Sequence, residues 1–247
     1  MKSILITGCN RGLGLGLVKV LVKSSKPPQH IFATCRDLAN ATELKDLAAI
    51  NPSIHILEID LNNFNSYENL TKQINEMVKD EGLNVLFNNA GFAPKSTRIT
   101  TIKLDDLMQA LQINTVAPIM LTKACLPLLK QASEANCNME MGVRRAAIIN
   151  MSSILGSIGA NTDGAMYAYR TSKAALNAAT KSMSIDLSKN EILSVSLHPG
   201  WVRTDMGGAN APLDVQTSSS KIIETLLKLG KTDNGGFYQY DGKHLPW

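Results

Sequence analysis

Short apolar runs alternate with longer amphipathic stretches along this chain, and that alternation constrains the fold more than any other feature. The stretches between the runs carry apolar residues at helical spacing, for example Leu70, Ile74 and Val78. Apolar strands that alternate with helices form parallel sheets covered on both faces. Because crossovers between parallel strands are right-handed, we expect an α/β fold, a doubly wound parallel sheet of about seven strands with helices on both faces.

The expected strands cover residues 3–7, 31–35, 54–59, 85–87, 146–151, 193–197 and 236–240. Expected helices include residues 104 to about 133, 167–187 and 221–229. Two segments look inserted: residues 157–165, and the polar residues 134–145, which we expect to be flexible and to place Met139 and Met141 on a surface. No linker or repeat divides residues 1–247, so a single domain is expected.

Charge and composition exclude several classes of protein. A chain that is 44% hydrophobic and 19% charged is typical of a folded globular protein. The net charge of +4 is small and the basic residues are scattered, so no nucleic-acid partner is expected. Residues 113–129 are the most apolar later stretch, but Lys123 and two prolines interrupt it, so no membrane span is expected. The four cysteines form no C-x-x-C pair and no export signal is visible, which favours a cytoplasmic protein without a metal site.

A glycine-rich segment directly follows the first expected strand and reads Thr7-Gly8-Cys9-Asn10-Arg11-Gly12-Leu13-Gly14. A loop between a parallel strand and its helix directs backbone N–H groups and the positive end of the helix toward an anion. Glycines let the backbone approach a pyrophosphate closely. The segment therefore predicts a dinucleotide-binding site.

The end of the second strand indicates which dinucleotide binds. Arg36 and Asp37 follow this strand about twenty residues after the last glycine, where such sites contact the adenosine ribose. Arg36 and Arg11 together would bind the 2′-phosphate of NADPH. Asp37 would favour NADH instead if the strand ended one residue later. We expect NADPH.

Tyr169 and Lys173 lie four residues apart in an expected helix and therefore share one of its faces. An ammonium at roughly 4 Å would lower the pKa of the phenol from about 10 to near 7, where it could act as a general acid or base. By itself, this spacing also suits a surface pair on an amphipathic helix. Upstream, Ser152 and Ser153 end the fifth strand, where a hydroxyl could bind a substrate carbonyl oxygen.

These motifs occur in the order typical of the short-chain dehydrogenase/reductases, a family that the chain resembles from Thr7 to Thr204. The shared segments are the glycine loop, Asn88-Asn89-Ala90-Gly91, Asn114, Ser153, Tyr169 with Lys173, and Pro199-Gly200. Residues 4–14 and the tail 235–242 resemble the Sniffer and C-factor branch of that family. The resemblance implies a single Rossmann-type domain and a carbonyl reductase that transfers a hydride from NADPH to an aldehyde, ketone or quinone.

The resemblance also implies roles for individual residues. Ser153 (or Ser152, as the alternative) positions the carbonyl, Tyr169 donates the proton, Lys173 lowers the pKa of Tyr169, and Asn114 holds a water that relays protons to Lys173. The implied cofactor-binding residues are Gly8, Asn10, Arg11, Gly12, Leu13, Gly14, Arg36, Asp60, Leu61, Asn89, Ala90, Gly91, Tyr169, Lys173, Pro199, Gly200, Val202 and Thr204. Asp60 is explained equally well as a helix N-cap, and Asn88 as a tie between strands.

Other interpretations stay open from the sequence. Residues 205–220 resemble the mobile substrate loop of the family, and a homodimer through the two long helices is common in it. A non-catalytic NADPH-binding regulator would need the glycine loop and Arg36 but not Tyr169 or Lys173. A third hypothesis is an NAD(P)-linked alcohol or steroid dehydrogenase that works in the oxidative direction. His55, His198 and His244 are expected to be structural.

Overall fold

The computed structural model describes residues 1–95 and 98–247, and its strands form one parallel sheet. The strands are β1 (Ser3–Ile6), β2 (His30–Cys35), β3 (Ile54–Glu58), β4 (Val85–Asn88), β5 (Ala147–Met151), β6 (Leu193–His198) and β7 (Phe237–Gln239). They lie in the order β3-β2-β1-β4-β5-β6-β7, and every neighbouring pair is parallel. The prediction of a doubly wound sheet is confirmed.

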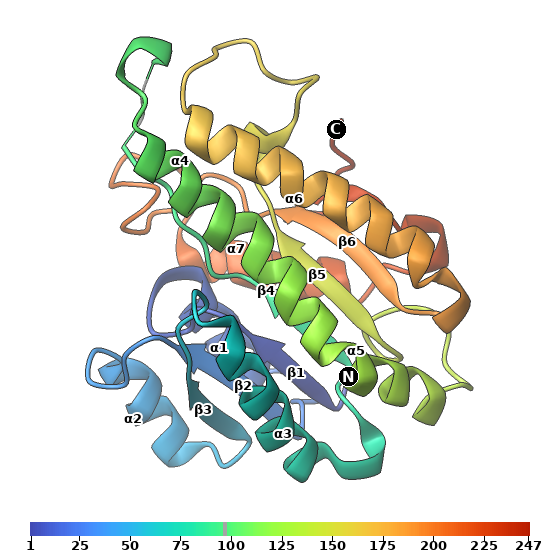
Figure 1. The fold of residues 1–247 in the computed structure, drawn as a ribbon. Helices are drawn as coiled ribbons and strands as arrows, with labels where there is room; N and C mark the ends of the chain where they lie inside the picture. Colours follow the sequence, from blue (N-terminus) through green and yellow to red (C-terminus); the bar gives the residue numbers. More distant parts are fainter. Residues whose placement is uncertain (96–97) are drawn as a thin grey trace.

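Helices cover both faces of the sheet (Figure 1). They are α1 (Gly12–Val22), α2 (Thr42–Ile50), α3 (Tyr67–Val78), α4 (Leu104–Leu111), α5 (Ala117–Ala135), α6 (Tyr167–Asp186) and α7 (Val215–Leu226). Side chains alternate across each strand, so Ile4 and Ile6 pack in the core beneath α1 and α7, whereas Leu5 packs in the opposite core with α3 and α5. Among the described residues, no helix has the length and apolar character that crossing a membrane requires.

Two expected helices differ from those in the structure. The helix expected over residues 104–133 consists of α4, a π turn at Gln112–Val116, and α5. The helix expected at 221–229 begins earlier, at Val215, because the side chain of Asp214 caps it by accepting a 2.6 Å hydrogen bond from the Thr217 amide. Residues 215–220 are therefore helical, and only 205–214 of the expected substrate loop lie outside a helix.

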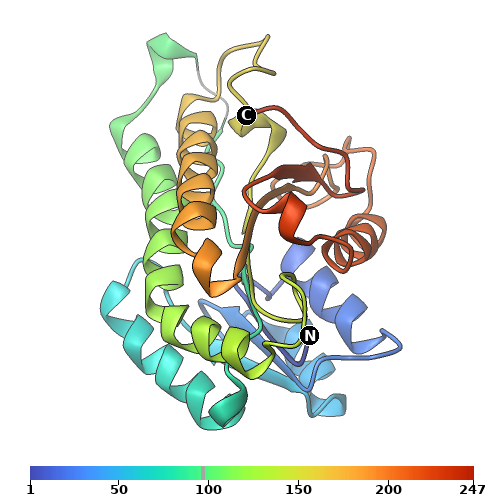
Figure 2. The same ribbon diagram turned by 90° about the vertical axis from the view of Figure 1, so that its right-hand side faces the viewer.

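The two inserted segments are both held by the rest of the chain. In residues 134–145, Arg145 Nε donates a 2.9 Å hydrogen bond to Ser133 Oγ, and Met141 is buried in the core beside β5 and β6 rather than on a surface as expected. Met139 is exposed. The segment 157–165 lies beside the C-terminus (Figure 2), where the Gly159 amide donates to the Trp247 carbonyl oxygen at 2.9 Å.

Candidate active site

The loops that follow β1 and β4 are tied together at the point where the strand order reverses. In open parallel sheets this is where ligands bind, beyond the carboxyl ends of the strands. Thr7 Oγ1 accepts hydrogen bonds from the Asn89 amide at 3.0 Å and the Ala90 amide at 2.9 Å, and Asn89 Nδ2 donates to the Thr7 carbonyl oxygen at 2.7 Å. Sequence reasoning included Asn89 and Ala90 in the site but missed that Thr7 holds them against the glycine loop.

The glycine loop has the backbone arrangement that a pyrophosphate needs. α1 begins at Gly12, and no side chain caps its first turn, so that turn presents N–H groups to a ligand. Gly14 packs so closely on the Gly8 carbonyl oxygen that any Cβ there would collide with it. The loop therefore fits the phosphates of a dinucleotide, with Asn10 and Leu13 between its glycines.

At the expected adenosine end of the site, Arg36 and its neighbour Asp37 differ in their binding partners. Both carboxylate oxygens of Asp37 bind locally, one to the Ala39 amide at 2.8 Å and the other to Asn40 Nδ2 at 2.5 Å. Arg36 is exposed directly after β2 and forms no ion pair within the described part of the chain. This arrangement favours Arg36 as the group that faces the ribose.

Arg11, which we expected to bind the 2′-phosphate together with Arg36, pairs its guanidinium with Asp205 at 2.8 Å. The ion pair joins the glycine loop to the segment after β6. Both side chains are largely exposed, at 73% and 74%. Solvent-exposed pairs are weak, so a phosphate could replace Asp205 as the partner of Arg11.

Asp60 and Leu61, after β3, have hydrogen-bond partners close by in the chain, whereas Asn88 in β4 binds to the neighbouring strand β5. Asp60 Oδ1 accepts from the Asn62 amide at 2.9 Å and from Asn62 Nδ2 at 3.2 Å, so it stabilises the turn in which it lies. Leu61 is partly buried, and its carbonyl oxygen accepts a 2.7 Å hydrogen bond from the Tyr67 hydroxyl. Asn88 Nδ2 donates to Asn150 Oδ1 at 2.8 Å, which confirms that it ties β4 to β5.

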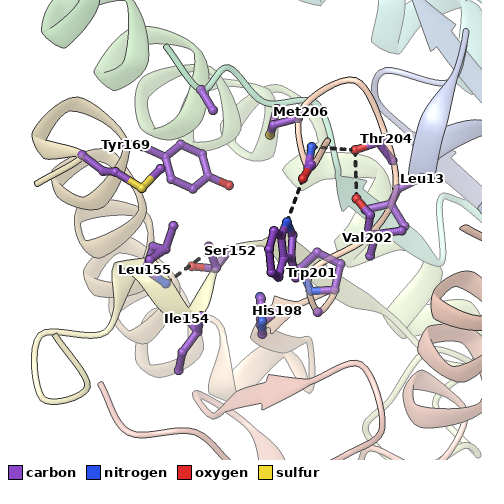
Figure 3. Close-up of a pocket in the computed structure, with 16 residues that line it drawn as sticks. Leu13, Ser152, Ile154, Leu155, Tyr169, His198, Trp201, Val202, Thr204 and Met206 are labelled. Atoms are coloured by element: carbon purple, nitrogen blue, oxygen red, sulfur yellow. Dashed lines mark hydrogen bonds between the residues drawn. The ribbon is translucent and has the colours of Figure 1, made fainter. Parts of the chain in front are cut away.

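Tyr169 and Lys173 lie on the face of α6 that meets the ends of the central strands. Tyr169 points into a cavity (Figure 3), and Lys173 is buried beneath it with Nζ 5.8 Å from the centre of the tyrosine ring. Lys173 Nζ donates a 2.6 Å hydrogen bond to the Met151 carbonyl oxygen at the end of β5. Lys173 is therefore enclosed and Tyr169 is half-buried at the cavity wall, which excludes the alternative of a pair on an exposed helix face.

The two serines after β5 have different environments. Ser152 Oγ donates a 2.6 Å hydrogen bond to Asn177 Oδ1 in α6 and is thereby used to hold the helix on the sheet. Ser153 caps the 3₁₀ turn Ile154–Gly156 by accepting from the Leu155 amide at 3.2 Å, and it lines the same cavity as Tyr169, whose pKa it tends to lower. Ser153 is thus the serine placed to act with Tyr169.

Burial changes the protonation of the Tyr169–Lys173 pair in a direction that the spacing alone did not predict. Desolvation raises the pKa of Tyr169 to about 12, against a smaller lowering contribution from Ser153. Desolvation also lowers the pKa of Lys173 to about 7. The sequence estimate placed the phenol near pH 7 because it counted the attraction of the ammonium but not the loss of hydration of both groups.

Asn114 lies in the π turn and is completely buried. Its Oδ1 accepts from the Phe92 amide at 2.7 Å, and its Nδ2 donates to the Phe92 carbonyl oxygen at 2.7 Å and to Ser172 Oγ at 2.9 Å. A Cβ added to Gly91 would lie 3.4 Å from Asn114 Oδ1 and 3.7 Å from Lys173 Nζ, so these three residues are close neighbours. The side chain of Asn114 therefore fixes the loop after β4 beside Lys173.

The cavity at Tyr169 has a volume of about 490 Å³, and Leu13 of the glycine loop forms part of its lining. Most of its wall is apolar, and the segment after β6 supplies Pro199, Gly200, Trp201, Val202, Thr204, Met206 and Gly207. Gly200 has φ +82°, and a Cβ there would collide with Leu213, so this close turn requires glycine. Thr204 Oγ1 accepts from the Gly207 amide at 3.1 Å.

His198 belongs to the wall of this cavity, where sequence reasoning had assigned it a structural role. It is the last residue of β6, and its Nδ1 is enclosed without a hydrogen-bond partner among the described residues. Burial lowers its pKa to about 4. Its position immediately before Pro199 and Gly200, at the carboxyl end of a central strand, was the signal that could have placed it at the site.

A dinucleotide cradle beside a cavity that is lined by tyrosine, with a buried lysine beneath the tyrosine ring, is the arrangement of a nicotinamide-dependent oxidoreductase. A family model described as short chain dehydrogenase matches residues 2–212, and the chain belongs to that family. The C-signal protein of Myxococcus xanthus is 39% identical over 165 residues, which are 67% of this chain and 93% of that protein.

Solved structures of the same family are similar over the whole chain. Carbonyl reductase Sniffer of D. melanogaster is 65% identical, with a TM-score of 0.99 and all of both chains covered. An NADPH-bound carbonyl reductase from chicken fatty liver is 38% identical, with a TM-score of 0.94 over 100% of this chain and 99% of that one.

Proposed function

We propose that this protein is an NADPH-dependent carbonyl reductase that reduces an aldehyde, ketone or quinone, with Tyr169 as the general acid. The observation that carries the proposal is that Ser153 and Tyr169 line one cavity, and that this cavity also reaches Leu13 of the glycine loop. NADPH bound along that loop supplies the hydride. The NADPH-bound carbonyl reductase from chicken fatty liver and Sniffer of D. melanogaster support the choice of cofactor and reaction.

The protonation of Tyr169 favours reduction over oxidation. With a pKa of about 12, Tyr169 carries its proton at neutral pH and is ready to donate it to a carbonyl oxygen that gains negative charge. Ser153 donates a hydrogen bond to the same oxygen and orients it. Oxidation of an alcohol would instead require the phenolate, which burial opposes. This favours the reductase over the alcohol dehydrogenase.

Lys173 and a water bound to the main chain of the π turn that contains Asn114 return the proton to Tyr169 in this proposal. The ammonium of Lys173, beneath the tyrosine ring, stabilises the phenolate that forms when the proton leaves. Lys173 also hydrogen-bonds the nicotinamide ribose. The three hydrogen bonds of the Asn114 side chain leave little room for the relay water there. We place that water on the main chain of the π turn, where the helical hydrogen-bond register changes.

The lining of the cavity supports an uncharged substrate. Ile154, Leu155, Met166, Trp201 and Met206 form most of the wall, and no described lining residue carries a charge at neutral pH, since the pKa of His198 is about 4. A phosphate or carboxylate would be buried there without a partner, which is unfavourable. The proposed substrates are therefore small or medium-sized uncharged carbonyl compounds.

Two further proposals concern the location of the protein in the cell and its oligomeric state. A cytoplasmic location is supported by four cysteines that form no disulfide, of which three are buried thiols. A homodimer through the two long helices is supported by apolar side chains exposed along α4, the π turn and α5 (Leu104, Met108, Val116 and Ile119), and by the exposed Ile185 of α6. Light scattering of the purified protein tests the dimer, and Met108→Lys should dissociate it.

Cofactor oxidation with a panel of carbonyl compounds tests the proposed reaction. Uncharged quinones, aldehydes and diketones should oxidise NADPH, whereas a phosphorylated ketone should not. If NADPH binds but no carbonyl oxidises it, the protein is a nucleotide-binding regulator. If only alcohols react, with NADP⁺ or NAD⁺, the direction of the proposal is wrong.

A further inference from the structure

The segment 201–213, which we term the flap, is a compact loop held by its own hydrogen bonds. Val202 and Leu213 form a bridge at its base, and Arg203 Nη1 donates to the carbonyl oxygens of Ala211 at 2.9 Å and Pro212 at 3.0 Å. Trp201 Nε1 donates to the Gly207 carbonyl oxygen at 2.7 Å. The flap can therefore move as a unit, and it carries Trp201 and Met206 of the cavity wall with it.

The flap meets the glycine loop at two neighbouring points. Arg11 Nη1 lies 2.8 Å from Asp205 Oδ2, and a Cβ added to Gly12 would lie 3.6 Å from Thr204 Cγ2. Within the described residues, neither Arg11 nor Asp205 has another ion-pair partner. We propose Arg11, as the sequence predicts, as a ligand of the 2′-phosphate of NADPH, and its guanidinium is thus held by a carboxylate of the flap.

Arg11 therefore has two anionic partners that compete for it. We infer that Asp205 is a cofactor-specificity residue: it competes with the 2′-phosphate of NADPH for Arg11, and phosphate binding releases the flap from the glycine loop. The inference rests on the proposed role of Arg11 at that phosphate. NADH has a hydroxyl at this position and leaves the ion pair intact.

The size of the effect follows from the exposure of the pair. An exposed ion pair of this kind is worth at most about 1 kcal/mol, or roughly a fivefold change in a binding constant. A phosphate offers Arg11 a doubly charged, bidentate partner and displaces the carboxylate. Asp205 therefore weakens NADPH binding without preventing it, and it couples the adenosine end of the cofactor to the wall of the substrate cavity.

Calorimetric titration of NADPH and NADH tests the competition. Asp205→Asn should tighten NADPH binding about two- to fivefold and leave NADH binding unchanged. Arg11→Ala should weaken NADPH binding, and in that background Asp205→Asn should have no further effect. Glu224→Gln is the control. It makes the same change in net charge within an exposed ion pair of α7, with Lys221, and should leave the affinities for NADPH and NADH unchanged.

Fluorescence of Trp201 tests the release of the flap with nucleotides that lack the nicotinamide. In a Trp247→Phe background, adenosine 2′,5′-bisphosphate should change the emission of Trp201, whereas adenosine 5′-monophosphate should not. In the Asp205→Asn variant neither nucleotide should change it, because the flap is already detached from Arg11. An equal response of wild type and variant to the bisphosphate would overturn the release.

Two results in the titrations would overturn the inference for different reasons. If Arg11→Ala weakens NADPH binding but Asp205→Asn leaves it unchanged or weakens it, Arg11 binds the phosphate and Asp205 does not compete. If Arg11→Ala has no effect on NADPH binding, the proposed role of Arg11 itself is wrong. Neither result depends on whether the protein reduces carbonyls.

Discussion

Lys173 Nζ donates a 2.6 Å hydrogen bond to the Met151 carbonyl oxygen, so the catalytic face of α6 is fixed to the end of β5. This contact places an ammonium in a site that is almost fully buried, with 2% of the residue exposed. Burial opposes the charge, as the lowered pKa of Lys173 shows. The group that supports the chemistry should therefore destabilise the cofactor-free protein.

Lys173→Met should raise the melting temperature of the cofactor-free protein at neutral pH while abolishing activity. The folded-state pKa of about 7 lies below the ordinary value of 10.5, so between these values the unfolded chain binds more protons and stability rises with pH. The destabilisation caused by burying the ammonium is complete below about pH 7 and disappears above the ordinary pKa of 10.5. Loss of the hydrogen bond to Met151 offsets part of the gain. We expect the free energy of unfolding to rise by about 1 kcal/mol or more, which corresponds to an increase in melting temperature of roughly 2–4 °C.

Thermal unfolding of wild type and Lys173→Met across this pH range is the measurement. The difference in melting temperature should shrink as the pH rises. Lys181→Met, on the exposed side of the same helix, is the control and should show no such pH-dependent gain. A variant that is less stable than wild type at every pH would contradict the burial argument.

Tyr169→Phe should lower the rate of carbonyl reduction by at least 10²–10⁴-fold, which corresponds to roughly 3–5 kcal/mol of activation free energy. The substitution keeps the ring but removes the proton that the mechanism donates, so NADPH binding should survive. Steady-state kinetics and cofactor titration measure the two effects. Tyr167→Phe is the matched control two residues away and should be nearly silent; the reverse pattern would assign the acid to Tyr167.

Ser153→Ala and Ser152→Ala should separate a catalytic from a structural serine. Removing Ser153 removes a donor to the reacting oxygen, and the turnover number should fall roughly 10²-fold or more. Removing Ser152 leaves the buried Asn177 Oδ1 without its donor, so stability should fall by about 1–3 kcal/mol while turnover changes little. Steady-state kinetics and denaturant unfolding of both variants distinguish the catalytic serine from the structural one. Equal rate losses with equal stability losses would argue against the distinction.

Arg36→Asp should weaken NADPH binding roughly 10- to 100-fold and leave NADH binding much less affected, because a charged hydrogen bond to the 2′-phosphate is worth about 1.5–3 kcal/mol. Titration of both cofactors measures the ratio. Asp37→Ala should not change this ratio, since the Asp37 carboxylate is occupied by Ala39 and Asn40. Wild-type protein that binds both cofactors equally would show that Arg36 does not select between them.

The sequence by itself determined the order of the elements and the residue types of the site. Apolar runs gave every strand to within about two residues, since a strand buried on both faces must be apolar throughout. The glycine loop and the spacing of Tyr169 and Lys173 are local patterns, and local patterns can be read along the chain. The start of α7 was misplaced because the short polar cap at Asp214 was hidden in a segment rich in small residues.

The tertiary structure decided which of these residues meet and in what environment. Only packing shows that the Ser152 hydroxyl is bound to Asn177, whereas Ser153 shares the cavity wall with Tyr169. The pKa of Tyr169 moved in the direction opposite to the sequence estimate, because desolvation depends on the tertiary surroundings of the side chain rather than on its spacing from Lys173. The pairing of Arg11 with Asp205, and the place of His198 in the cavity wall, likewise join segments far apart in the chain, and no local pattern encodes such contacts.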